Sequence, residues 1–292
     1  MKELIIGMGE ALWDVLPEGK KIGGAPANFA FHVSQFGFES RVLSAVGNDA
    51  LGQEILDVFD QKNVKYILPK VSYPTGTVQV TLDEKGIPNY EIKEGVAWDH
   101  IPFTSELEAL AKQTRAICFG SLAQRNEESQ NTINRFLDAI PVGDDRLKIF
   151  DINLRQHYFN EEILVNSLRK CNVLKINDEE ILVVSKLFGY EESEMTLIAE
   201  RILKEFDLKM VIMTCGVNGS YVFTVDGESF QSTPVVTLAD TVGAGDSFTG
   251  TFCAALLKGK SIREAHRLAV AVSAYVCTQH GAMPELPANL LF

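Results

Sequence analysis

The sequence predicts an α/β fold in which a mostly parallel central sheet lies between layers of helices. Short apolar runs rich in β-branched residues recur along the chain, as expected for strands that are buried on both faces. Amphipathic stretches of helical length separate these runs. Regular alternation of strand and helix is typical of a parallel sheet whose crossover connections are helices.

Six apolar runs carry the strand prediction. They are residues 4–6, 41–46, 116–119, 147–150, 172–176 and 210–213. Two stretches give clear helical stripes, 49–61 with Leu51, Ile55, Leu56 and Phe59, and 196–206 with Ile198, Ile202 and Leu203. The chain shows no internal repeat, low-complexity tract or linker, so we expect one domain over residues 1–292.

Two segments depart from this rhythm and predict hairpins. In residues 75–93 apolar side chains alternate at Val78, Val80 and Leu82, and a turn at 83–86 leads to Tyr90 and Ile92. This pattern indicates antiparallel strands with one wet face that stand off the main sheet. An edge hairpin without a role is the alternative. Residues 221–225, followed by Asp226-Gly227, predict a second hairpin at the edge of the sheet.

Composition excludes several classes of protein. The 292 residues are 46% hydrophobic and carry a formal net charge of −12, which disfavours binding to nucleic acids or anionic membranes. The N-terminal apolar run is too short for a signal peptide, and no run approaches the length of a membrane span, so we expect a cytoplasmic protein. The five cysteines are widely spaced within apolar runs and predict free buried thiols. No spacing of Cys and His predicts a zinc site.

The strongest chemical signal is Gly243-Ala244-Gly245-Asp246, at the start of an apolar helical stretch. Glycines at a helix start leave backbone N–H groups uncovered, and these groups together with the helix dipole form a cradle for an anion. The carboxylate of Asp246 directly after such a cradle is unusual for a purely structural residue. Asp246 could alternatively be a first-turn acid that the helix dipole favours.

Polar groups also follow three consecutive predicted strands, where open α/β sheets bind ligands. The first group is 151–155, which includes Arg155. In the second, Asn177 and Glu180 are three residues apart and could converge on a hydrated cation, although a helix-capping pair is the alternative. The third is the glycine-rich turn 214–220, which could pass close to phosphate or could simply lead into the hairpin.

Taken together, these motifs resemble the ribokinase-type (PfkB) family of carbohydrate kinases. Asp240-Thr241-Val242-Gly243-Ala244-Gly245-Asp246 is similar to the family's C-terminal signature, and Gly23-Gly24-Ala25-Pro26-Ala27-Asn28 is similar to its N-terminal signature. The agreement covers nearly the whole chain in the right order. It implies a ribokinase-like three-layer fold with a small β lid built from residues of about 12–22 and 74–98. An exposed lid edge offers a surface for a homodimer.

The resemblance also implies site residues. The sugar would contact Asp14, Gly24, Asn28 and Asp246, with Asp246 as catalytic base, Arg155 near the transferring phosphate, and the amides of Gly243, Ala244 and Gly245 as anion hole. ATP and Mg²⁺ would be the cofactors. The nucleotide would lie along Asn177, Glu180, Thr214, Gly216, Gly219 and His280, with Glu180 reaching Mg²⁺ through water. Asp240 and Thr241 would supply part of a potassium site. An ordinary surface histidine is the alternative for His280.

Within the family, residues 9–17 together with Pro26 and Trp98 look most like the fructokinase branch, which converts D-fructose to fructose 6-phosphate. Ribokinase, 2-keto-3-deoxygluconate kinase and nucleoside kinase are the alternatives. Packing inside the lid is the other interpretation of Trp98.

Sequence motifs of other protein classes are each excluded by a single residue, with one exception. Leu12 breaks the dinucleotide-binding pattern that begins at Gly7. Ala254 stands where a P-loop would need its first glycine, so Ser261 and Glu264 indicate a capping box instead. Thr249 stands where a hydrolase nucleophile elbow needs its last glycine. A non-catalytic sugar-binding sensor on the same fold is the remaining rival, and the presence of Asp246 argues against it.

Overall fold

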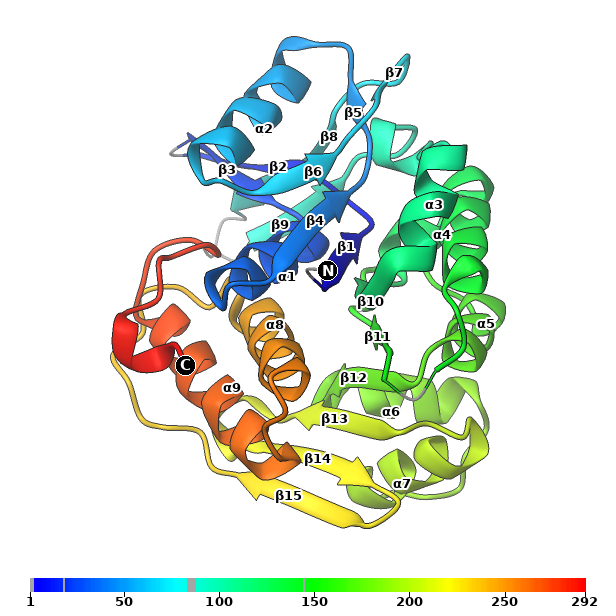
Figure 1. The fold of residues 1–292 in the computed structure, drawn as a ribbon, viewed down its shortest axis with the longest axis vertical. Coiled ribbons are helices and arrows are strands. Elements are labelled where there is room, and N and C mark those ends of the chain that lie inside the picture. The colour runs from blue at the N-terminus through cyan, green and yellow to red at the C-terminus, as the bar shows by residue number, and fades with distance from the viewer. Residues whose placement is uncertain (1–2, 18, 83–87, 144) are drawn as a thin grey trace.

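The computed structural model describes residues 3–17, 19–82, 88–143 and 145–292, with side chains from 80 to 90 outside the described set. Within this part, a sheet of nine strands runs through the molecule in the order β15-β14-β13-β12-β11-β10-β1-β4-β6 (Figure 1). The strands are β1 (Leu4–Met8), β4 (Glu39–Leu43), β6 (Lys65–Ile67), β10 (Thr114–Phe119), β11 (Leu147–Asp151), β12 (Val173–Asn177), β13 (Met210–Thr214), β14 (Ser220–Thr224) and β15 (Gly227–Gln231).

The main sheet is parallel from β6 to β13. Only β14 and β15, at one edge, pair in the antiparallel sense, which confirms the predicted hairpin after residue 220. Because β1, β10, β11, β12 and β13 run in the same direction, their carboxyl ends meet along one edge of the sheet. The polar groups that follow these strands in sequence therefore gather there.

Helices cover both faces of this sheet, as the sequence predicts. Successive strand residues point to opposite faces, so Ile6 and Ile117 pack with one helical layer while Ile5 and Ala116 pack with the other. The first layer contains α3 (Ser105–Gln113), α4 (Glu127–Ala139), α5 (Glu161–Lys170), α6 (Asp178–Leu187) and α7 (Met195–Glu205). The second contains α1 (Ala25–Gln35), α8 (Ala244–Leu257) and α9 (Ile262–Cys277).

One strand prediction needs correction. Residues 41–46 do not form a single strand, because β4 ends at Leu43 and a separate two-residue strand, β5 (Val46–Gly47), pairs with β7 (Lys70–Val71). The N–H of Ser44 still bonds to the Ile67 carbonyl, whereas that of Val46 bonds to Pro69. The chain thus changes partners in the middle of a continuous apolar run, which hydrophobicity alone does not reveal.

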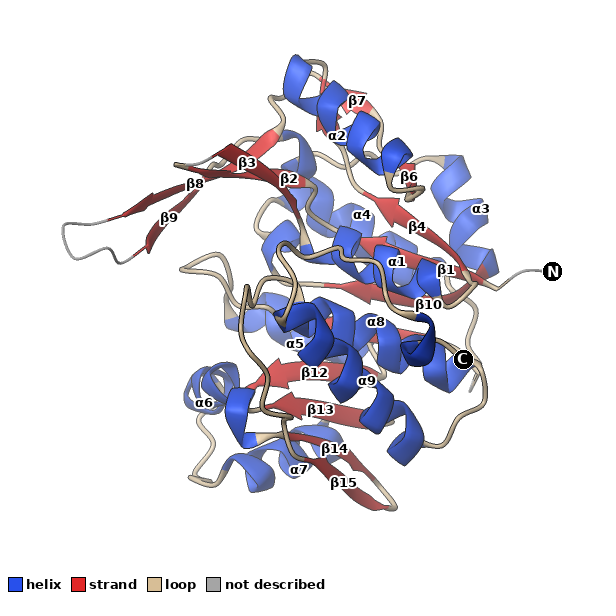
Figure 2. Cartoon of the chain, turned by 90° about the vertical axis from the view of Figure 1, so that its left-hand side faces the viewer, coloured by secondary structure: helices blue, strands red, loops and turns tan. Residues whose placement is uncertain are grey.

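A second sheet of four strands stands off the main one (Figure 2). We call it the small sheet; its order is β3-β2-β8-β9, from β2 (Leu12–Leu16), β3 (Gly19–Gly23), β8 (Gly76–Leu82) and β9 (Pro88–Ile92). The pair β8–β9 is antiparallel, as the pattern in 75–93 predicts. The predicted turn at 83–86 and the side chains of Val80, Leu82 and Tyr90 lie outside the described residues.

The two faces of the small sheet differ. Trp13 and its register partner Ile22 point toward α2 (Ala50–Gln61), where they pack in one apolar cluster. Asp14 and its register partner Lys21 occupy the opposite face, because side chains alternate along a strand. The small sheet is therefore anchored to α2 by one face, and on the other Asp14 and Lys21 lie beside Val78 and Ile92, which pack in the core cluster of Trp98.

The cysteines and the lengths of the helices bear on two further predictions. All five cysteines are unpaired, and four of them are buried. In the described residues, no helix combines the length and apolar character that a membrane crossing requires.

We predict that Asp49→Ala lowers the free energy of unfolding by about 2 kcal/mol, measured by urea denaturation. Asp49 caps α2 by accepting from the Gly52 N–H at 2.8 Å, and it also accepts from the backbone N–H and the hydroxyl of buried Thr75, just before β8. Asn160→Ala is the matched control, because Asn160 caps α5 with one bond to Ile163. An equal loss in both variants would contradict the double role of Asp49.

Candidate active site

The N-terminus of α8 lies where the sequence predicts an anion cradle. Gly243 is the N-cap residue with φ of 78°, and no side chain caps the helix. A Cβ atom at Gly243 would lie 2.6 Å from the side chain of Ala282, so only glycine fits this position. The Ala244 N–H donates to the Thr241 carbonyl at 3.3 Å. The open first turn of a buried helix offers N–H groups and a positive dipole end to an anion.

Asp246 lies in the first turn of α8 and contacts the other predicted signature directly. Its Oδ2 accepts a hydrogen bond of 2.7 Å from Nδ2 of the buried Asn28, on α1. Burial and the nearby Asp151 raise the pKa of Asp246 to about 6, against the lowering effects of Asn28, Lys175 and Arg155. Asp246 is therefore a better proton acceptor than a solvated aspartate, yet it is mostly ionised at neutral pH.

Two more carboxyl groups with raised pKa values belong to this site. Burial raises the pKa of Glu10 to about 7, with Asp246 adding to the shift. One oxygen of Glu10 accepts from the Ala25 N–H at 3.3 Å, and the other is buried without a hydrogen-bond partner. Burial likewise raises the pKa of Asp14 to about 6, although Arg155 and Lys21 oppose it. Gly24 is held close, since a Cβ there would meet the Glu10 carbonyl at 2.4 Å.

Asn177 and Glu180 form a capping box at the start of α6. Asn177 accepts from the Glu180 N–H at 2.8 Å, and Glu180 accepts from the Asn177 N–H at 2.9 Å. The other oxygen of Glu180 accepts from the Leu154 N–H. The capping pair, the alternative in the sequence, is thus what the structure shows. Among the described residues, no group of three or more His, Cys, Asp or Glu side chains could hold a metal.

The residues expected to bind the nucleotide lie on neighbouring elements. Thr214, at the end of β13, is the register partner of Asn177 on β12. The turn after it is a short 3₁₀ helix from Gly216 to Asn218, and both Gly216 and Gly219 have positive φ. His280 is exposed, as its alternative interpretation allows.

Asp240 precedes the cradle and is already engaged. Its carboxylate accepts from the N–H groups of Val242 and Gly281, and Lys21 of the small sheet lies 3.7 Å away. Burial alone would raise the pKa of Asp240, but these backbone bonds and Lys21 hold it below the usual value. Thr241 is exposed. The two residues do not form a ready cation site in this arrangement, because protein donors occupy the carboxylate.

Arg155 is exposed and lies in a strained segment after β11. Asn153 and Gln156, on either side of it, have left-handed φ values of 43° and 47°. The Arg155 charge lowers the pKa values of Asp14 and Asp246, so it lies near both. Strained backbone of this kind tends to occur at functional sites.

The structure adds three residues that the sequence analysis did not single out. Asp151 ends β11, Lys175 lies in β12, and Glu10 follows β1, and each is buried among apolar neighbours. For Lys175, the sequence does carry a signal: a charged residue stands inside the apolar run Leu174-Lys175-Ile176. Ionised side chains are seldom buried without a partner, so such a residue indicates a buried ion pair.

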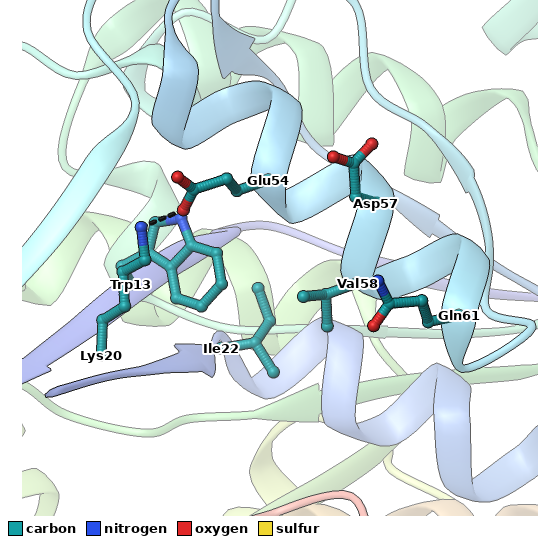
Figure 3. A pocket seen from close by; sticks show the side chains of 7 residues that line it. All are labelled: Trp13, Lys20, Ile22, Glu54, Asp57, Val58 and Gln61. Carbon is teal, nitrogen blue, oxygen red and sulfur yellow. Dashed lines mark hydrogen bonds and ion pairs between the residues drawn. The ribbon is translucent and has the colours of Figure 1, made fainter.

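A cavity of about 450 Å³ lies between the small sheet and α2 (Figure 3). Its lining residues are Trp13, Lys20, Ile22, Glu54, Asp57, Val58 and Gln61. None of the predicted site residues lines it, and Asp14 lies on the other face of the sheet. This cavity is therefore separate from the candidate active site.

Fold and site together define a class of α/β proteins in which polar side chains gather at the carboxyl ends of parallel strands, between the uncapped N-terminus of a buried helix and a separate small sheet. The model of the pfkB family of carbohydrate kinases matches residues 17–289. The chain belongs to this family, and it is therefore a sugar kinase of the ribokinase-like fold.

Individual relatives show the same likeness over nearly full length. An ATP-dependent 6-phosphofructokinase of Thermoanaerobacterium thermosaccharolyticum is 29% identical, over 92% of this chain and 82% of the relative. A fructokinase of Salmonella typhimurium is 27% identical, over 96% and 95%. The crystal structure of a fructokinase with bound ATP from Xylella fastidiosa superposes with a TM-score of 0.84 at 21% identity, over 98% and 96%.

We predict that Gly243→Ala destabilises the protein clearly more than Gly259→Ala. Both glycines have φ of 78°, so both variants incur the left-handed strain of about 1–2 kcal/mol. Gly259 has open space around it, whereas a Cβ at 243 meets Ala282. Urea denaturation of the two variants isolates the contact with Ala282. Equal destabilisation would show that the cradle has room for a side chain.

Proposed function

We propose that the protein transfers the γ-phosphoryl group of ATP to a primary hydroxyl of a sugar, with D-fructose as acceptor and fructose 6-phosphate as product. The observation that carries the proposal is the contact between Asn28 and Asp246, beside the N-terminus of α8. This contact joins α1 to a carboxylate that can accept a proton and that lies in the first turn of α8, next to the anion cradle.

In the proposed mechanism, Asp246 orients the acceptor hydroxyl and takes its proton as the new bond to phosphorus forms. With a pKa of about 6 it cannot ionise a sugar hydroxyl beforehand. Asn28 fixes one oxygen of the carboxylate, which leaves the other to receive the proton. Base and positioning residue are then the same side chain.

The cradle and the charged groups around it would stabilise the transferring phosphoryl group. Phosphoryl transfer depends on alignment and charge neutralisation, because negative charge spreads over the equatorial oxygens in the transition state. The N–H groups of Gly243 and Gly245 would supply donors, that of Ala244 would do so on leaving the Thr241 carbonyl, and Arg155 would supply a positive charge. Mg²⁺ would add charge neutralisation when bound with ATP, reached from Glu180 through water.

The remaining roles follow the family pattern. The small sheet, residues of about 12–22 and 74–98, would be the lid that excludes water from the reaction, within a single domain. The nucleotide would lie along Asn177, Thr214, Gly216, Gly219 and His280. A potassium ion at Asp240 and Thr241 would require Lys21 to move away, since its ammonium is 3.7 Å from Asp240. A homodimer through the lid and a cytoplasmic location complete the proposal.

The charges of the site favour a neutral acceptor. Glu10, Asp14, Asp151 and Asp246 are four carboxyl groups, and the cations that act on them are Arg155, Lys21 and Lys175. A sugar acid, such as 2-keto-3-deoxygluconate, or a sugar phosphate would bring a further negative charge into this acidic site. Neutral fructose fits better, and ribose is the alternative. Trp98 is 1% exposed and stacks against Arg125, so it packs beneath the small sheet.

The test is ADP release by the purified protein with ATP, Mg²⁺ and a panel of fructose, ribose, 2-keto-3-deoxygluconate, a nucleoside and fructose 6-phosphate. We expect fructose to give the highest kcat/KM. Asp246→Ala should lower kcat by at least about 10²–10³-fold while ATP binding persists. Asp226→Ala, in the exposed hairpin turn, is the control. A near-normal kcat in Asp246→Ala would refute the assignment, and sugar binding without ADP release would indicate the sensor.

We further predict that kcat/KM falls about tenfold per pH unit below pH 6. The base must be ionised to accept a proton, and the raised pKa of about 6 places its protonation there. The measurement is a profile from pH 4.5 to 8.5 at saturating ATP. An acid limb near pH 4, the value for a solvated aspartate, would show that burial does not raise the pKa of the base.

A further inference from the structure

Lys175 and Asp151 form an ion pair directly beneath the cradle. They are register partners on the neighbouring strands β12 and β11, and their charged atoms are 3.1 Å apart. Both side chains are almost fully buried, with 10% and 6% of their surfaces exposed. Burial alone would lower the pKa of Lys175, but Asp151, Glu180 and Asp246 raise it, so the ammonium remains charged.

Stability does not account for such a pair. Removing two charges from water costs several kcal/mol per ion, and apolar side chains of similar volume often stabilise a core equally well. The neighbouring side chains on the same face of the sheet include the apolar residues Ile149, Val173 and Ile212, which would accommodate such a replacement. The location of the pair therefore points to a role in the site.

The pair is connected to the first turn of α8 by two contacts. The Thr249 hydroxyl lies 3.2 Å from Asp151 Oδ2 and 3.0 Å from the Gly245 carbonyl, so its single proton bridges these two acceptors. On the other side, Lys175 Nζ lies 3.1 Å from where a Cβ of Gly245 would be, so the ammonium lies against the cradle backbone. One member of the pair thus holds the turn that carries Asp246, and the other brings a positive charge next to it.

We propose that Lys175 is a positioning residue of the sugar kinase site, which neutralises Asp151 and thereby keeps Asp246 ionised and able to accept a proton. The proposal rests on the proposed function for its consequence in catalysis. Without the ammonium, Asp151 and Asp246 would be two close like charges in a buried site, and such pairs retain a proton on one member. Asp246 would then be protonated at a pH where the enzyme should work.

The charged and titratable groups around Asp246 come from several elements. They are Asp151 on β11, Lys175 on β12, Arg155 after β11, Glu10 after β1 and Cys118 on β10, while Glu180 on α6 acts on Lys175. Burial raises the pKa of the Cys118 thiol well above its usual value, so it is neutral. Asp151 raises the pKa of Asp246 and Lys175 lowers it. The two members of the pair therefore act on Asp246 with opposite signs.

The test measures the ionisation of Asp246 directly, by NMR titration of protein labelled with ¹³C at the aspartate carboxyl carbons, with the signal assigned from Asp246→Asn. In Lys175→Met we expect the pKa of Asp246 to rise by about one unit, and in Asp151→Asn to fall by a similar amount. In the double variant, the pKa of Asp246 should be close to its value in the original protein. The acid limb of the kcat/KM profile should move in the same directions.

Lys148→Met is the matched control. Lys148 lies on β11 near the opposite end of the strand, where its Nζ donates to the Leu137 carbonyl. Its replacement should change stability without moving the Asp246 titration or the acid limb. Should Lys175→Met fail to fold, the downward shift in Asp151→Asn and the restored value in the double variant provide the same test.

The outcomes separate the two proposals. Opposite shifts in the two single variants support the role of Lys175, because a purely structural role predicts no such reversal. An unchanged titration of Asp246 in both, or shifts of the same sign, would overturn it. Opposite NMR shifts in a protein that phosphorylates no sugar of the panel would uphold the electrostatic role and overturn the proposed function.

Discussion

The position of the α8 N-terminus is the constraint on which the site depends. Phe248 and Phe252 bury the helix in the core, so packing rather than a surface loop fixes its first turn. The contact between Gly243 and Ala282 determines how closely the chain approaches that turn. Donors held in this way need no rearrangement when charge develops, which is the condition for strong electrostatic stabilisation. The same packing brings Asp246 to Asn28, since α1 and α8 share the layer on one face of the sheet.

Burial of the carboxyl groups links the site to the stability of the fold. Glu10, Asp14 and Asp246 have raised pKa values, so each contributes stability below its unfolded pKa that is lost as the pH rises through about 6 to 7. Burial lowers the pKa values of His32 and His266 to about 4, so each contributes stability above its unfolded pKa that is lost as the pH falls toward 4. The carboxyl groups thus reduce stability at the pH where an ionised Asp246 is useful.

Much of this arrangement could be predicted from the sequence, because the strongest signals are local. The apolar runs predict the parallel strands, and the glycines at 243 and 245 predict the start of α8. What could not be predicted depends on contacts between distant residues. The break after Leu43 follows from a change of hydrogen-bond partner, from Ile67 to Pro69. The pairing of Lys175 with Asp151 follows from strand register, which two separate runs in the sequence do not specify.

The small sheet is attached to the rest of the chain on both faces, but its contact with the cradle is weak. On one face, Trp13 donates to the Leu51 carbonyl of α2 at 3.0 Å and packs in a buried apolar cluster. Asp49 ties α2 to Thr75, so helix and sheet are joined at a second point. On the other face, Leu12, Val78 and Ile92 pack in the core cluster of Trp98. Lys21 on that face reaches Asp240 at 3.7 Å from a side chain that is 48% exposed, and ion pairs of this kind contribute little. Parting Lys21 from Asp240 would therefore cost less than separating the sheet from either apolar cluster, and any opening of the site should leave both clusters packed.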